Sequence, residues 1–217
     1  MTNLINLQEL KIRRIGASKV ESVLSSIAKL NRIQSLELHL STHPEYVAFP
    51  TLVPFSHCHH LRALSLWGKI ERLPEDPYHE FPPRLTELCL GDSMVGPEAI
   101  AILEKLPNLM SLSLSINSYM GKEIECSTQG FPQLRMLGMD WLESKEWEIK
   151  GGALPRLNLL HIEDCYNLKK IPIGLRFVAS LRVLELCDMS EEFWDRFHRG
   201  EDAHEIRCIP SIVNIRR

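Results

Sequence analysis

The residues best able to do chemistry in this chain are the run His57-Cys58-His59-His60 and the pair His204-Glu205. Tetrahedral zinc needs ligands whose side chains converge on one point, and four consecutive residues rarely achieve this. His204-Glu205 lacks the second histidine, four positions after the first, that a zinc-protease helix supplies. We therefore interpret the histidine run as a solvated turn and predict that the chain holds no metal and no cofactor.

Cysteine nucleophiles are the next possibility. The six cysteines are widely spaced and form no CxxC pair, and no G-x-S-x-G nucleophile motif occurs. Cys89 and Cys187 fall at outward strand positions with no base beside them, so we expect free surface thiols. Cys165 is expected to be buried and to bond a backbone turn. The chain is therefore predicted not to be an enzyme. Unpaired cysteines and the lack of an Asn-x-Ser/Thr acceptor favour a reducing compartment.

Composition excludes other classes. The formal net charge is -3 and the pI is about 6.3, so no basic stripe for nucleic acid or a membrane surface is expected. No apolar run approaches the roughly 20 residues of a membrane span. Residues 1–14 show no charged segment followed by an apolar core, and so do not resemble a secretory leader.

The strands that must position these side chains follow from one repeated sequence motif. It consists of an apolar residue, any two residues, an apolar residue, any one residue and a further apolar residue. Successive copies start 23 to 28 residues apart, within the period of a leucine-rich repeat. The copies start at Leu7, Ile33, Leu61, Leu85, Leu109, Leu134, Leu157 and Leu181. We predict an α/β solenoid over 1–217, a single leucine-rich-repeat domain with a parallel concave sheet of about eight strands.

The segments that return the chain to the next strand are predicted to form a mixed helical and irregular convex side. Residues 18–30 have helical apolar spacing behind a Ser18/Glu21 capping box. A second helix is predicted over about 97–106, and the other proline-rich returns are expected to be irregular.

The two ends of the chain differ. Ser190 is predicted to cap a third helix that ends before Gly200, within a C-terminal cap over 190–217, and residues 206–215 are predicted to add an edge strand. At the other end, Leu4, Leu7 and Leu10 begin a repeat with no polar cap. We therefore expect further protein before residue 1.

Outward positions on the strands form two columns, because side chains alternate along a strand. This concave face is basic at its N-terminal end, small and neutral in the middle, and acidic at its C-terminal end, a gradient that could orient a partner. Its candidate protein-binding residues are Lys11, Glu37, Ser65, Ser113, His161 and Glu185 in the first column, and Arg13, His39, Trp67, Ser115, Asp140 and Glu163 in the second.

Three of the four tryptophans have two interpretations each. An outward Trp67 is either an interface anchor or a side chain packed on His39, and the sequence favours neither. Trp141 and Trp147 lie in a charged return segment and are predicted to pack on the convex side rather than to bind a partner.

Residues 160–172 match the repeat variant LxLxxCxxLxxLP, and residues 64–74 are similar to it. In this variant the chain resembles plant intracellular immune receptors of the nucleotide-binding, leucine-rich-repeat type. Residues 4–10 resemble the start of their repeat domains, and residues 206–213 resemble the tail of the coiled-coil subclass. The resemblance covers nearly the whole chain and implies defence against pathogens through protein binding.

The resemblance also implies the partners: a pathogen effector, a guarded host protein, or a nucleotide-binding module in cis or in trans that this region restrains. No G-x-x-x-x-G-K-[ST] phosphate loop occurs, so the nucleotide switch itself is absent from this chain. We expect a cytoplasmic protein, with the nucleus or the membrane periphery as further locations. The alternative function is an adaptor or substrate-recognition scaffold of a ubiquitin ligase. An enzyme and an extracellular receptor are less favoured alternatives.

Overall fold

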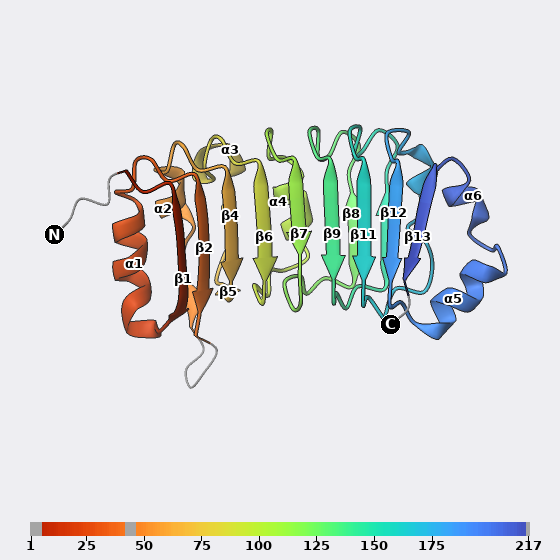
Figure 1. Ribbon diagram of the computed structural model, residues 1–217, viewed down its shortest axis with the longest axis horizontal. Helices are drawn as coiled ribbons and strands as arrows, with labels where there is room; N and C mark the ends of the chain where they lie inside the picture. The colour runs from red at the N-terminus through yellow and green to blue at the C-terminus, as the bar shows by residue number, and fades with distance from the viewer. Residues whose placement is uncertain (1–5, 42–46, 216–217) are drawn as a thin grey trace.

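A row of parallel strands dominates the computed structural model, which describes residues 6–41 and 47–215 apart from the side chains of Tyr78 and His79 (Figure 1). The predicted first leucine, Leu4, lies outside these residues. The nine strands of the large sheet follow the order β1-β2-β4-β6-β7-β9-β11-β12-β13. They are β1 Glu9–Ile15, β2 Ser35–Leu40, β4 Ala63–Trp67, β6 Glu87–Gly91, β7 Ser111–Leu114, β9 Met136–Asp140, β11 Leu159–Glu163, β12 Val183–Cys187 and β13 Ser211–Ile215.

Each copy of the sequence motif supplies one strand, and this confirms the predicted solenoid with its parallel sheet. The ninth strand, β13, is the edge strand predicted in the tail, and it pairs in parallel with β12. The inward residues of neighbouring repeats stand opposite one another, as Leu88 does with Leu112 and Leu112 with Leu137. Leu112 is completely buried, so the repeated leucines form one core that runs the length of the sheet.

The first return segment is helical, but it begins differently from the prediction. Residues Ala17–Lys19 form a 3₁₀ turn that leads directly into α1, Val20–Ile27. Neither element has a side-chain cap, so the predicted Ser18/Glu21 capping box is wrong. The reason is that Ser18 lies inside the 3₁₀ turn, whereas a capping serine must precede the helix in an extended conformation.

The other returns carry more regular structure than predicted. The second helix is present but short, as α4 Ala99–Leu103, and α2 Val53–Ser56 and α3 Pro77–Glu80 are single turns. Returns expected to be irregular form two further parallel pairs. These pairs join β3 Ala48–Phe49 to β5 Lys69–Ile70, and β8 Glu123–Cys126 to β10 Glu146–Ile149.

The alternation of exposed and buried residues explains the second of these convex pairs. Glu-Ile-Glu-Cys in β8 and Glu-Trp-Glu-Ile in β10 place every second side chain in the core. Such period-two patterning is typical of a half-buried strand. Trp147 of β10 is only 1% exposed, which confirms its predicted place on the convex side.

The C-terminal end of the sheet is covered by two helices, α5 Glu191–His198 and α6 Ala203–Ile206, which lie beyond β13 in Figure 1. Ser190 caps α5 as predicted, because its hydroxyl accepts a hydrogen bond from the backbone N–H of Phe193 at 3.3 Å. Gly200 follows the helix with a left-handed φ of 73°.

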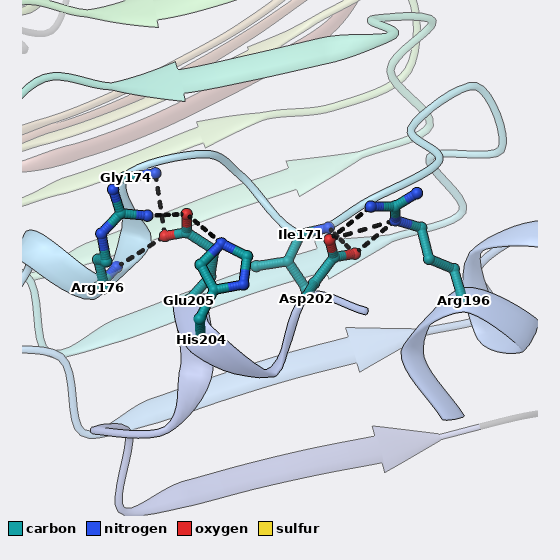
Figure 2. A network of polar contacts seen from close by, with 7 residues as sticks. All are labelled: Ile171, Gly174, Arg176, Arg196, Asp202, His204 and Glu205. Carbon is teal, nitrogen blue, oxygen red and sulfur yellow. Dashed lines mark hydrogen bonds and ion pairs between the residues drawn. The ribbon is translucent and has the colours of Figure 1, made fainter. Parts of the chain in front are cut away.

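From the start of α6 and from within it, Asp202 and Glu205 reach back to the 3₁₀ helix η3, Leu175–Phe177, and to the loop before it (Figure 2). Both acidic residues are buried. In the part of the chain that the structure describes, no helix is long and apolar enough to cross a membrane.

Candidate functional site

The concave face consists of the outward side chains of the nine-stranded sheet. Its first predicted column is in register from strand to strand: Lys11 stands opposite Glu37, Glu37 opposite Ser65, and His161 opposite Glu185. Ser113 joins the same column between Cys89 and Gly138. The sheet therefore brings together residues that lie 23 to 28 positions apart in the sequence.

The second column is less regular. His39, Trp67, Asp140 and Glu163 belong to it as predicted, since His39 stands opposite Trp67 and Asp140 opposite Glu163. Arg13 falls where the register of β1 shifts, and Ser115 lies one residue beyond the end of β7. These two side chains are therefore adjacent to the column rather than part of it.

One expectation for this column is wrong: Cys187 is 3% exposed and is not a surface thiol. Its strand is flanked on both sides, with Glu163 of β11 and Ile215 of β13 opposite Cys187. Cys89 is half-buried, and burial raises the pKa of its thiol. Neither cysteine is placed as a nucleophile.

At the N-terminal end, Glu37 is the centre of a polar cluster. Its carboxylate lies 2.5 Å from the Lys11 ammonium, 2.5 Å from His39 Nε2 and 3.8 Å from the Arg13 guanidinium. Burial would raise the pKa of Glu37, but the hydrogen bonds and charges of Lys11 and His39 outweigh it and lower the pKa. The basic end predicted from the sequence is therefore partly neutralised within the sheet.

Trp67 has the packed arrangement that was one of its two interpretations. Its ring stacks on His39 with the centroids 5.4 Å apart and an interplanar angle of 3°. Its Nε1–H donates to the Ser65 hydroxyl at 3.0 Å. On the other side the ring lies over Gly91, where a Cβ atom would come within 2.3 Å of it. Trp67 thus bridges three strands, and these contacts are all internal to the face.

The close approach of Trp67 to Gly91 gives a first prediction. Gly91→Ala should force the Trp67 ring off His39 and lower the free energy of unfolding by about 1–3 kcal/mol, the usual cost of overpacking. Urea unfolding followed by circular dichroism measures the change. Gly138→Ala is the matched control, because a Cβ there meets Ser113 Oγ at an ordinary 3.4 Å. Equal effects of the two substitutions would contradict the prediction.

At the C-terminal end, His161 lies between two carboxylates. Its Nδ1 is 2.9 Å from Glu185 Oε2, and its Nε2 is 3.2 Å from Glu163 Oε2. Asp140 is close by, and its pKa is raised by burial and by the neighbouring charges of Glu163 and Asp164. Burial is the larger cause of this shift, and the grouping of Asp140, Glu163 and Asp164 makes this end acidic, as predicted.

An exposed aromatic pair borders the acidic end and could not be found from the sequence pattern. Trp141 is 47% exposed and packs edge-on against Tyr166, with the ring centroids 5.6 Å apart. The prediction that Trp141 packs on the convex side is therefore wrong. Trp141 directly follows β9 and has a left-handed φ of 55°. The Tyr166 hydroxyl donates to Asp164 at 2.5 Å.

The remaining candidate chemical groups are dispersed. Around the histidine run, His57, His59 and His60 are exposed while Cys58 is buried, so the four side chains do not converge. Burial raises the pKa of Cys58 to about 11. Cys165 is buried as predicted, with its thiol directed at the Met139 carbonyl.

Burial and nearby charges make thiolates unfavourable in the core as well, since the pKa values of Cys126 and Cys165 are raised to about 12. Among the described residues, one acidic trio brings its ligand atoms within 4.8 Å of one another: Glu163, Asp164 and Asp188. The trio contributes to the negative charge of this end.

Comparison with known proteins gives one family and a set of relatives. Residues 1–203 match the family model described as a leucine-rich repeat region. The probable disease resistance RPP8-like protein 4 of Arabidopsis thaliana is 33% identical over 215 residues, which are 95% of this chain and 23% of the relative. The disease resistance protein RPP8 of the same plant is 30% identical over 217 residues, 98% of this chain and 24% of the relative. The chain thus spans about a quarter of the length of the curated relatives it matches.

Proposed function

The chain belongs to the leucine-rich repeat family, and on that premise we propose that it is the protein-recognition region of a plant disease resistance protein. In this proposal a pathogen effector or a guarded host protein binds the concave face, without catalysis by this chain. The same region restrains a nucleotide-binding module that lies outside the chain. The proposed location is the cytoplasm, where such a module would act.

The observation that carries the proposal is the in-register concave face. Polar side chains from successive repeats stand side by side on one open sheet, with Glu37 at one end and Glu185 at the other. The acidic end combines carboxylates with the exposed Trp141–Tyr166 pair. Aromatic side chains are enriched at the centre of protein interfaces, and the rim around them is polar. A partner with a basic segment would complement this end.

The test is co-precipitation of the tagged full chain from plant leaf tissue, comparing the wild type with Asp140→Lys/Glu163→Lys/Glu185→Lys. The matched control is Glu21→Lys/Glu123→Lys/Glu146→Lys, which makes the same charge change at exposed positions of the convex side. We expect the concave variant to lose at least about tenfold of the recovered partner, and the control to retain it.

The identity of the recovered protein separates the alternatives. Recovery of a nucleotide-binding module or a pathogen protein by the wild type and the control alone would support the proposal. Equal recovery by all three chains would contradict binding at the concave face. Ubiquitin-ligase subunits among the partners would favour the adaptor function instead. Equal urea midpoints for the three chains establish that each is folded.

A further inference from the structure

Six arginines occupy the edge of the sheet at which the strands begin, the upper edge in Figure 1. Three of them directly precede a strand, and three lie three residues before one. In the sequence they flank the first apolar residue of six repeats. We call this set the arginine edge: Arg62, Arg135 and Arg182 in the first group, and Arg32, Arg84 and Arg156 in the second.

The arginine edge is available for binding. All six side chains are exposed, and none forms an ion pair with another residue that the structure describes. Arg62, Arg84 and Arg135 also line one groove. Its other walls are formed by Thr86, Asn108, Met110 and Gln133. A guanidinium presents a rigid fork of donors that matches a carboxylate, so exposed arginines around a groove favour an anionic ligand.

The opposite edge of the sheet has the opposite charge. Asp92, Asp164 and Asp188 each directly follow a strand, in left-handed turns at φ 46–53°. A second charge polarity therefore runs along the strands, from their basic beginnings to their acidic ends, in addition to the gradient from strand to strand. The repeat thus gathers at one edge arginines that are scattered in the sequence.

We propose that the arginine edge is a docking surface for an acidic segment of another protein chain. Neighbouring strands are about 4.8 Å apart, so the arginines that precede β2, β4 and β6 can meet successive carboxylates of an extended peptide. Beside these arginines the groove offers the Gln133 amide and the Asn108 amide oxygen, while Asn108 Nδ2 donates to the Pro83 carbonyl at 3.0 Å. Side-chain amides both donate and accept, and so can pair with a peptide backbone.

The same groove argues against other anions. The apolar side chain of Met110 interrupts the row of charges, whereas a nucleic acid backbone favours continuous cationic contacts. A membrane surface would favour a broader basic face, but the concave face beside this edge carries Glu87 and further acidic residues. The proposal concerns a surface separate from the concave binding residues, and its test uses none of them.

The experiment measures binding of a fluorescein-labelled 15-residue peptide of alternating glutamate and glycine by fluorescence anisotropy at low and moderate salt. We expect the wild-type chain to bind it, and Arg62→Glu/Arg84→Glu/Arg135→Glu to bind about tenfold more weakly or less. The matched control is Lys105→Glu/Lys122→Glu/Lys145→Glu. It makes the same change in net charge at exposed positions near the convex helix and strands.

Three results would overturn the proposal. They are no binding of the peptide by the wild type, equal weakening in the two variants, and equal binding of a lysine–glycine peptide. Vesicles containing phosphatidylserine and a 15-nucleotide single strand of DNA are titrated in parallel. If either binds more tightly than the peptide and is lost in the arginine variant alone, that class of anion replaces the acidic protein segment. Urea midpoints of both variants confirm that the chains compared are folded.

Discussion

Leu112→Ala is expected to lower the free energy of unfolding by about 2–5 kcal/mol, because it leaves a cavity in the middle of the continuous core. Leu112 is 0% exposed, and its strand β7 has β6 on one side and β9 on the other. The opposing residues, Leu88 and Leu137, come from different repeats, so the cavity cannot close by a shift of one segment. Urea unfolding followed by circular dichroism measures the loss.

Two controls separate burial from other effects of substitution at this place. Ser113→Ala changes the outward side of the same strand and should change stability by less than about 0.5 kcal/mol. Leu10→Ala, in the edge strand β1, should cost less than Leu112→Ala because Leu10 is only partly buried. A Leu112→Ala cost close to that of Ser113→Ala would mean that the inward side of the repeats has been assigned wrongly.

The strands of the large sheet could be predicted from the sequence because each obeys two constraints at once. The motif around Leu112 recurs at the period of a repeat. Its last two apolar residues both face the core, because side chains alternate along a strand. Stacking then sets the register, since a slip by one residue would place Leu112 on the open face. The same two constraints are enough to predict that His161 and Glu185 share one column of the concave face.

The convex side could not be predicted as well, because its segments differ from repeat to repeat. The sequence of residues 18–30 does not recur in the other return segments. The capping motif at Ser18 therefore had no support from other repeats, and the sequence does not reveal that Ser18 lies in a 3₁₀ turn. The pair β8–β10 was detectable in principle, because Glu-Ile-Glu-Cys and Glu-Trp-Glu-Ile alternate strictly. Four residues of alternation are a weak signal by themselves, and each strand also needs a partner in the neighbouring repeat.

The candidate site was predicted in its columns but not in its contacts. Whether Trp67 binds a partner or packs internally depends on the residue beneath it, Gly91, which belongs to the next repeat. Burial of Cys187 depends on β13, a strand outside the repeat pattern. The arginine edge emerges only when the repeats are aligned on their first apolar residue, since the net charge of -3 conceals it.

Glu205→Ala is expected to lower the free energy of unfolding by about 3–5 kcal/mol, the cost of removing one partner from a buried ionic network. Glu205 is 2% exposed, and its carboxylate accepts hydrogen bonds from the backbone N–H groups of Gly174 at 3.1 Å and Arg176 at 3.3 Å. It also pairs with the Arg176 guanidinium and lies 3.3 Å from His204 Nε2 (Figure 2). Alanine leaves the buried Gly174 N–H and the part-buried Arg176 N–H without their acceptor.

Hydrogen exchange of the backbone amides measures which part of the chain is destabilised by the loss of Glu205. The residue joins α6 to the loop that precedes β12, so exchange should accelerate first around Gly174 and in β13 and last in β7. Glu205→Gln retains an acceptor and should cost less than alanine. Glu201→Ala removes exposed ion pairs to Arg196 and Arg199, and should cost less than about 1 kcal/mol.

Comparing the unfolding free energies of Glu205→Ala and Glu201→Ala shows how the C-terminal helices are held on the end of the sheet. A terminal repeat of a solenoid has an open apolar end. The segment that covers this end contributes to the stability of the whole array of repeats. Here Asp202 and Glu205 fix α6 to backbone donors 31 residues earlier, at Ile171 and Gly174, so that the covering is held by polar contacts as well as by the packing of Phe193. If the two substitutions cost the same, apolar packing alone holds the helices in place. A larger cost for Glu205→Ala, with exchange faster at Gly174 than in β7, means that the buried carboxylate holds the end of the sheet closed.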